Sequence, residues 1–335
     1  MKEAKLYKKL EDGKVQCNTC AHQCKITKGK RGICGVRENR EGTLYSLVYG
    51  KAIAMHVDPI EKKPLFHFYP GTRSFSLATV GCNMRCLNCQ NADISQMPKD
   101  RDLIQGEDFP PEVVVQTALK NRCRTIAYTY TEPAVYLDYA YDTSKLAHES
   151  GVKNIFVTNG HFSKESLEMV APYLDGANVD LKSFSDETYR NNCGARLQPV
   201  LDTIRRMKEH GIWVEVTTLL IPDLNDSEDE LRSIARFLYE VDPGIPWHVS
   251  RFHPTYRMMD RPPTNLKSIQ KACKIGLDEG IRYVYSGNVP GEERESTFCY
   301  SCGARLIHRW GFEVASNRIV DGKCPECSSV IDGVW

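Results

Sequence analysis

Three cysteines in the middle of the chain have a spacing suited to a redox-active metal cluster. Cys82, Cys86 and Cys89 are separated by three and then two residues, and they lack the paired arms of a tetrahedral zinc site. Thiolates are the natural ligands of iron–sulfur clusters, and a cluster of four irons takes four ligands. Three thiolates would leave one iron open to a molecule that carries an amine and a carboxylate. The triplet therefore predicts a catalytic [4Fe–4S] cluster.

A later group of four cysteines has a different pattern, with two C-x2-C arms at Cys299, Cys302 and at Cys324, Cys327. Arms about twenty residues apart are typical of a zinc ribbon, in which four thiolates close round one structural ion. Zinc is the expected metal, and a rubredoxin-like iron is the alternative. Because so small a segment has little core, the metal should supply much of its folding free energy. The segment could also cap the mouth of a larger domain.

An earlier group is less regular and comprises Cys17, Cys20, Cys24 and Cys34, with His22 inside it. These four thiols could close on zinc, with His22 as an alternative ligand, or they could hold an auxiliary iron–sulfur cluster. The pattern slightly favours zinc.

Composition limits the class of protein. The net charge is +1, which gives no support for binding to nucleic acid or to a membrane. The sequence contains fourteen cysteines but no apolar secretory signal and no run of about 18 apolar residues. We therefore expect a cytoplasmic protein whose cysteines bind metals rather than form disulfides.

The elements that must position the triplet lie between residues 71 and 290, where short apolar runs alternate with helical periodicity. The expected strands are Ser74–Val80, Thr125–Tyr130, Asn154–Thr158, Ala177–Leu181, Trp213–Leu220, His248–Phe252 and Arg282–Tyr285. The expected helices are 110–122, 134–149, 164–172, 197–210, 227–240 and 264–279, with Ser163 and Asp226 as N-cap candidates. This pattern predicts an α/β fold with a partial (β/α)6-type parallel barrel of six or seven strands. Residues 1–70 and 291–335 form small Cys-rich appendages.

Polar residues follow the expected strands, at the end of a parallel barrel where catalytic groups gather. The carboxylate of Glu132 suits an ammonium group, although a glutamate at a helix start would look the same. Thr158 and Asn159 suit ribose hydroxyls, although Asn-Gly is also a common turn. The neighbouring Asp180 and Lys182 could bind a cosubstrate or form a simple salt bridge.

The triplet, with Gln90 and Asn91 after it, resembles the radical SAM superfamily and its pyruvate formate-lyase activating enzyme-like branch. The segments 128–133 and 180–182 resemble the Gly-Gly-Glu-Pro and Asp-x-Lys segments of this branch. The N-terminal cysteines and the segment 283–291 resemble a subgroup called the AmmeMemoRadiSam system radical SAM enzymes. The resemblance covers nearly the whole chain and implies a [4Fe–4S] cluster and S-adenosylmethionine as cofactors.

The same resemblance implies a set of cosubstrate contacts. Glu132 would bind the methionine ammonium, Lys182 its carboxylate, and Asp180 would position it or the ribose. His253 resembles a late-barrel histidine of the family that contacts the cosubstrate, although it could equally be an ordinary strand-end histidine. The other expected contacts are Thr131, Thr158 and Asn159, with Asn91 and Asn288 as candidates for holding the adenine. Asn88 departs from the family pattern, because the residue before the third cysteine is commonly aromatic and lies against the adenine.

Among the isolated cysteines 123, 193 and 273, only Cys193 invites a functional interpretation, as a hydrogen-atom relay or substrate contact, and a buried inert thiol is the alternative. The resemblance implies reductive cleavage of S-adenosylmethionine to a 5′-deoxyadenosyl radical that abstracts hydrogen, with electrons from a ferredoxin or flavodoxin. The substrate could be a glycyl radical protein, another protein, RNA or a small molecule. A metal-ribbon binding module on a degenerate barrel is the non-enzymatic alternative.

Overall fold

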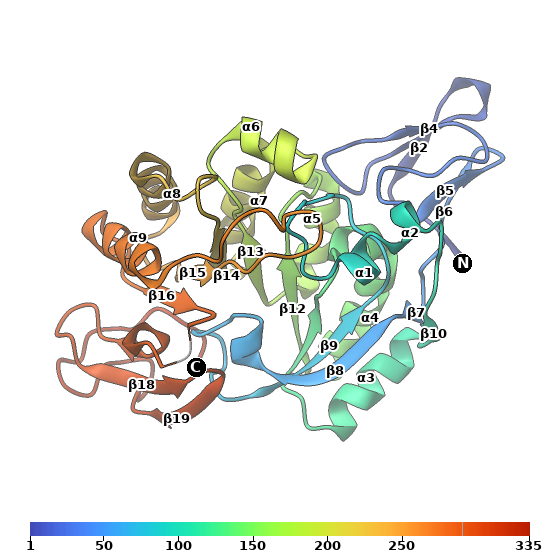
Figure 1. The fold of residues 1–335 in the computed structure, drawn as a ribbon. Coiled ribbons are helices and arrows are strands. Elements are labelled where there is room, and N and C mark those ends of the chain that lie inside the picture. Colours follow the sequence, from blue (N-terminus) through green and yellow to red (C-terminus); the bar gives the residue numbers. More distant parts are fainter. Residues whose placement is uncertain (290) are drawn as a thin grey trace.

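One sheet runs through the middle of the computed structural model, which describes residues 1–289 and 291–335 (Figure 1). Within these residues the sheet has eight strands in the order β16-β15-β14-β13-β12-β11-β9-β8. Seven of them pair in parallel: β9 (Arg73–Ala78), β11 (Thr125–Tyr128), β12 (Lys153–Thr158), β13 (Gly176–Asp180), β14 (Trp213–Leu220), β15 (Trp247–Arg251) and β16 (Val284–Gly287). The sheet has two edges, β16 and β8, which confirms the predicted partial parallel barrel.

Strand β8 (Ala54–Pro59) pairs antiparallel with β9 and extends the sheet beyond the predicted core. It comes from the segment that the sequence assigned to the N-terminal appendage. Its side chains alternate little in burial and are mostly half-buried or exposed, so it carries no clear strand pattern. The appendage therefore supplies one strand to the central sheet.

Helices connect the parallel strands, as expected for βα units. The longer ones are α3 (Pro111–Lys120), α4 (Leu137–Glu149), α5 (Lys164–Val170), α7 (Gln198–Glu209), α8 (Glu228–Val241) and α9 (Leu266–Asp278). Ser163 is the N-cap of α5, since its hydroxyl accepts from the Ser166 N–H. The expectation that Asp226 caps α8 is wrong, because Ser227 accepts from the Glu230 N–H instead. Ser227 and Glu230 have the S-x-x-E spacing of a capping box, which explains the shift by one residue.

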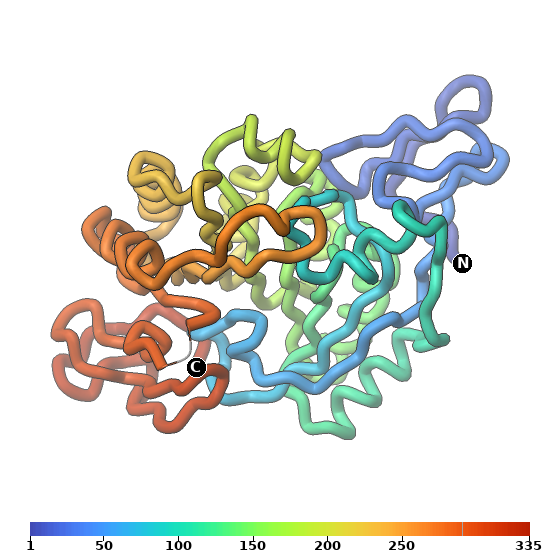
Figure 2. Tube along the Cα trace, viewed as in Figure 1, coloured from blue at the N-terminus to red at the C-terminus, as the bar shows by residue number. Residues whose placement is uncertain are grey.

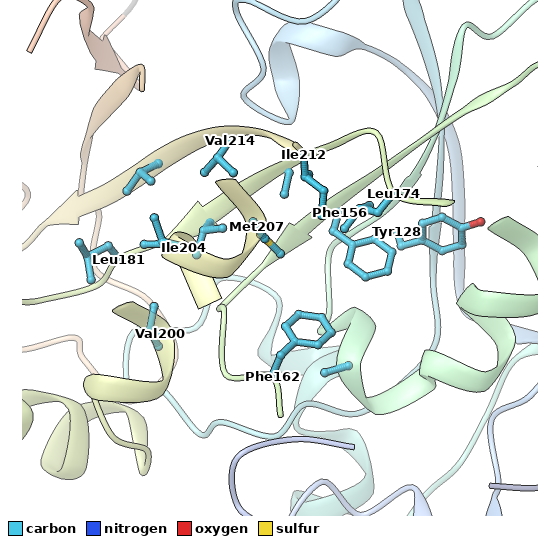
Figure 3. Close-up of a cluster of buried hydrophobic side chains, with 14 of the residues drawn as sticks. Tyr128, Phe156, Phe162, Leu174, Leu181, Val200, Ile204, Met207, Ile212 and Val214 are labelled. Carbon is cyan, nitrogen blue, oxygen red and sulfur yellow. The ribbon is translucent and has the colours of Figure 1, made fainter. Parts of the chain in front are cut away.

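The core between the sheet and these helices is continuous and apolar. Figure 3 shows part of it, where Val200, Ile204 and Met207 of α7 lie near Phe156 and Val214. All five side chains are fully buried, so the parallel strands are covered as their apolar sequences predict.

The N-terminal residues form a lobe beside the sheet (Figure 2), and it contains several short strands. The strands are β1 (Lys2–Glu3), β2 (Tyr7–Lys9), β3 (Val15–Cys17), β4 (Lys25–Ile26), β5 (Arg37–Arg40), β6 (Thr43–Ser46) and β7 (Lys51–Ala52), of which β7 pairs with β10 (Glu107–Asp108). Arg37 of this lobe forms a buried ion pair with Asp138 of α4, with 2.6 Å between Nη2 and Oδ2. The lobe is thereby anchored on the helix that follows β11.

The C-terminal residues form a three-stranded sheet of β17 (Thr297–Phe298), β18 (Arg305–Trp310) and β19 (Glu313–Asn317). This module packs below the strand starts: the Val334 N–H donates to the His67 carbonyl at 2.7 Å, and Arg309 donates to the Phe66 carbonyl. The expectation that it caps the barrel mouth is therefore wrong. Pro290, at the predicted boundary of the module, lies outside the described residues.

Helices long and apolar enough to span a bilayer are not found in residues 1–289 and 291–335.

Candidate functional site

The loop that carries the triplet begins where β9 ends. Just before Cys82, Gly81 has a φ of +102°, a conformation that favours glycine, and its N–H donates to the Ile94 carbonyl at 3.1 Å. At the other end of the loop, the sulfur of Cys89 lies 3.2 Å from the Ser95 hydroxyl. The short helix α1 (Ala92–Ser95) thus holds both ends of the loop.

A second segment holds the middle of the loop. The N–H groups of Arg85 and Leu87 donate to the carbonyls of Cys193 and Asn192, at 2.9 and 3.0 Å. The side chain of Asn192 donates to Asn88 Oδ1 at 3.0 Å. The polar residue that departs from the family pattern therefore has a structural partner, in the π-helical turn Tyr189–Cys193 after α6 (Asp186–Thr188).

The donor set of the triplet fits an iron–sulfur cluster. Burial raises the pKa of the Cys82 and Cys89 thiols, so their thiolates need a cationic partner such as a metal. In the described part of the chain, the three sulfurs of the triplet do not all lie within 4.8 Å of one another, as they would round a single ion. Thiolates that bind different irons of one cluster are held farther apart. The ligand roles of these cysteines remain a prediction that this geometry supports.

Glu132 lies at the end of β11 and is buried, with 2% of its surface exposed. Its carboxylate accepts from the Ala134 N–H (3.0 Å), the Thr158 hydroxyl (2.8 Å) and the Asn159 N–H (2.8 Å). It therefore caps the helical turn Pro133–Tyr136. A carboxylate has about four acceptor positions, so one remains for a donor such as an ammonium group. Burial raises the pKa of Glu132 to about 7, and a bound cation would counter this effect.

Asp180, the last residue of β13, forms an ion pair with Lys182 just after the strand, with 2.8 Å between Oδ2 and Nζ. Burial alone would lower the pKa of Lys182, but Asp180 and the nearby Cys86 raise it above its ordinary value. The salt bridge that the sequence left as an alternative is present. It also places a cation beside the cluster loop, where a carboxylate of a cosubstrate could meet it.

Asn159 has contacts that the sequence did not indicate. Its amide donates to Asn83 Oδ1 at 2.8 Å and lies 3.7 Å from Cys82 Sγ. Thr158 is engaged as well, since its hydroxyl donates to Glu132 and accepts from the Gly160 N–H. Asn159 thus helps to hold the cysteine loop in place, and Thr158 helps to hold the Glu132 carboxylate. Contact of either side chain with a ribose stays a prediction.

The remaining predicted contacts also lie at strand ends. Asn91 Nδ2 donates to the Tyr130 carbonyl at 2.8 Å, and the Thr131 hydroxyl donates to the Thr79 carbonyl at 2.8 Å. His253 and Asn288 are exposed after β15 and β16. Their cosubstrate roles stay predictions.

The two flanking cysteine groups differ in spacing. In the C-terminal module the sulfurs of Cys299 and Cys327 are 3.6 Å apart, those of Cys302 and Cys324 are 3.7 Å apart, and all four lie within 4.8 Å of one another. Four thiolates at about 2.3 Å from one zinc ion would be about 3.8 Å apart, so this group can hold a metal ion. Among the described residues, no three sulfurs of the N-terminal thiols at positions 17, 20, 24 and 34 lie within 4.8 Å of one another.

A parallel α/β sheet with a three-cysteine loop after its first parallel strand defines an enzyme class that uses a cluster with an open iron. The sequence model of the radical SAM superfamily matches residues 76–238. The chain is 46% identical over 335 residues to an uncharacterized protein of Methanocaldococcus jannaschii, and the match covers 99% of both chains. It is 21% identical over 161 residues to the pyruvate formate-lyase-activating enzyme of Clostridium pasteurianum, which covers 48% of this chain and 67% of that enzyme.

Among solved structures, a radical SAM methyltransferase from Sphaerobacter thermophilus matches with a TM-score of 0.51 and 16% identity over 71% of each chain. This match concerns the fold alone. The sequence comparisons show the family: the chain carries a radical SAM domain and belongs to the radical SAM superfamily.

Sequence reasoning missed the long-range contacts that hold the cysteine loop. Asn83, within the loop, contacts Asn159, which is 76 positions away, and Asn192 contacts Asn88 of the loop from 104 positions away. Neither has a local sequence signal, because an asparagine in a loop is compatible with many turns. Cys193 was noted, and it is buried beside Cys86, close enough to raise the pKa of Cys86.

Proposed function

We propose that this protein cleaves S-adenosylmethionine reductively and uses the resulting 5′-deoxyadenosyl radical to abstract a hydrogen atom from a substrate. Membership of the superfamily supports a [4Fe–4S] cluster and S-adenosylmethionine as cofactors. The observation that carries the proposal is the convergence of Cys82, Glu132 and Lys182 beyond the ends of β9, β11 and β13. When bound, the cluster supplies the electron and a coordination site for the methionine end of the cosubstrate.

The residues of the chain then have separate tasks. The cysteine triplet holds the cluster, and Asn159 directs an N–H toward Cys82 Sγ, a contact that tunes reduction potential in iron–sulfur proteins. Glu132 offers its remaining acceptor position to the methionine ammonium, and Lys182 offers its ammonium to the carboxylate. An electron donor such as a ferredoxin or flavodoxin is required as a partner.

Activation of a glycyl radical protein is our first candidate for the reaction. It is supported by the similarity to an enzyme named for pyruvate formate-lyase activation. Radical modification of a small molecule, RNA or another protein is the second candidate, because a shared fold does not determine the substrate. Electron paramagnetic resonance separates the two, since a persistent radical on a partner protein occurs only in the first.

The decisive experiment incubates the cluster-loaded protein with S-adenosylmethionine and a strong reductant without oxygen. We expect release of 5′-deoxyadenosine and methionine. The Lys182→Ala variant should keep its iron but bind the cosubstrate more weakly by calorimetry. Lys164→Ala, which removes an exposed lysine at the start of α5, is the matched control. Absence of 5′-deoxyadenosine from a cluster-loaded sample would favour the binding-module alternative.

We further propose that the C-terminal cysteines hold structural zinc and that the protein works in the cytoplasm. The support for this location is the number of cysteines and their clustering in groups with metal-ligand spacing, which a reducing compartment favours.

A further inference from the structure

The four N-terminal thiols line a single cavity between the N-terminal lobe and the barrel. Its wall includes Cys17, Cys20, Cys24 and Cys34 together with Arg37 and Asn83. The four thiols therefore face one shared space rather than separate parts of the lobe.

The spacing of these thiols is unlike that of the zinc-type group in the same chain. The sulfurs of the C-terminal group approach one another to 3.6 and 3.7 Å, as thiolates round one ion do. Among the described residues, the three sulfurs of the triplet do not all lie within 4.8 Å of one another, and neither do any three sulfurs of the N-terminal group. The N-terminal thiols are therefore not gathered round one ion, and thiolates that bind different irons of a cluster need no such close approach.

Arg37 provides a second, independent observation. Its side chain is 2% exposed, and Nη2 is paired with Asp138, but Nε and Nη1 are buried without a hydrogen-bond partner. Buried cationic donors without acceptors are costly, so their presence in a cavity wall indicates an anionic occupant. A [4Fe–4S] cluster with four thiolate ligands is a large anion, and its sulfurs accept hydrogen bonds.

We propose that Cys17, Cys20, Cys24 and Cys34 bind an auxiliary [4Fe–4S] cluster that relays electrons to the catalytic cluster. The assignment replaces the slight preference for zinc that the cysteine pattern suggested. All four irons have a protein ligand, so this cluster has no open position for a substrate. Its role is therefore electron transfer.

The cavity adjoins the catalytic loop directly. Asn83 lines the cavity and is the chain neighbour of Cys82, so only one residue separates the two sites. His22 Nε2 lies 2.8 Å from the Asn83 carbonyl oxygen, which connects the N-terminal lobe to that residue. A Cβ added to Gly81 would lie 3.2 Å from the Cys34 carbonyl oxygen, so the two cysteine loops are packed against each other.

The electron balance of the relay is simple. A low-potential one-electron donor protein of the ferredoxin or flavodoxin class reduces the auxiliary cluster by one electron and is itself oxidised. The auxiliary cluster passes that electron to the oxidised catalytic cluster and returns to its starting state. The relay role rests on the proposed function, whereas the presence of the auxiliary cluster does not.

The first test measures iron, sulfide and zinc after anaerobic reconstitution. The wild-type protein should hold about eight irons, and the triple variant Cys82→Ala, Cys86→Ala, Cys89→Ala should keep about four, in a cluster that gives an electron paramagnetic resonance signal on reduction. The double variant Cys20→Ala, Cys34→Ala should keep the four irons of the catalytic site. A triple variant with no iron and two zinc ions would overturn the assignment, whatever the outcome for S-adenosylmethionine cleavage.

The second test concerns the relay. Reduction of the catalytic cluster by a reduced flavodoxin, followed by stopped-flow absorbance, should be at least tenfold slower in the Cys20→Ala, Cys34→Ala variant. An unchanged rate would refute the relay.

The third test uses Arg37. Arg37→Gln should make the potential of the auxiliary cluster more negative, and Arg37→Lys should keep most of the wild-type value because the positive charge remains. Arg40→Gln, on an exposed residue of the same strand, is the matched control. Equal potentials in all four proteins would show that Arg37 does not face the cluster.

Discussion

The contact between the C-terminal module and the barrel should weaken in mild acid because of His67. This residue is fully buried, its Nδ1 lies 2.6 Å from the Asp332 carbonyl oxygen, and its Nε2 lies 2.5 Å from the Tyr285 hydroxyl. Burial lowers the pKa of His67 to about 4. When the C-terminal module separates from the barrel, His67 regains its ordinary pKa of about 6.5 and binds a proton more readily. The closed state therefore loses stability relative to this opened state as the pH falls from about 6.5 to 4.

The size of the effect follows from these two pKa values. Linkage gives a loss of about 2 kcal/mol in the free energy of opening between pH 7 and pH 5. The His67→Gln variant removes the titrating group, so it should be less stable at pH 7 but show a pH dependence that is flatter by this amount. His210→Gln, on an exposed histidine after α7, should leave the profile unchanged.

Hydrogen exchange at two amides reports this opening. The Val334 N–H donates to the His67 carbonyl, and the Tyr69 N–H donates to the Val334 carbonyl, both at 2.7 Å. Their protection, corrected for the intrinsic rate at each pH, gives the free energy of opening. Parallel pH profiles for the wild type and His67→Gln, at constant zinc, would refute the assignment of the acid sensitivity to this side chain.

Three further perturbations have defined outcomes. Gly81→Ala should lower the melting temperature and the iron content more than Gly151→Ala does. Both glycines have positive φ, but a Cβ at Gly81 would lie 2.7 Å from Val36 Cγ1, whereas the space at Gly151 is open. Equal changes in the two variants would show that Val36 and the N-terminal lobe can shift to accommodate the added methyl group. Asn159→Ala should make the potential of the catalytic cluster more negative in a redox titration, because an N–H near Cys82 Sγ is lost; an unchanged potential would contradict the hydrogen bond. Cys302→Ser should release about one zinc ion per chain by elemental analysis and raise exchange throughout residues 297–334, with the catalytic irons retained; retained zinc would argue for a different ligand set.

The parallel strands could be predicted because most are short, largely apolar or β-branched runs followed by a polar strand end. All seven expected parallel strands are present, and Ser163 caps α5 as its position before a helical pattern suggests. Strand β8 could not be predicted, because its exposure at the sheet edge requires no apolar pattern. Local composition therefore predicts the parallel strands of the sheet but not its antiparallel edge strand.

The site was predictable to the extent that strand ends converge in a parallel barrel. Glu132 and Lys182 lie near the triplet for this reason. Arg37 and Asp138 are 101 positions apart, and nothing in either local sequence indicates that they pair. The same holds for Asn192, whose contact with Asn88 depends on the fold of a distant turn.

The position of the C-terminal module has a consequence for synthesis. Residues 305–334 emerge from the ribosome after all seven parallel strands, yet they supply the partners of Phe66 and His67 beneath those strands. A chain under synthesis therefore has its cysteine triplet and all seven parallel strands while the floor of the barrel still lacks these contacts. Domains generally fold as units in the order of their synthesis, but here the segment before the first parallel strand depends on contacts from a module that is made last. We expect the final, protected barrel, and stable retention of its iron, to follow release of the module rather than accompany elongation.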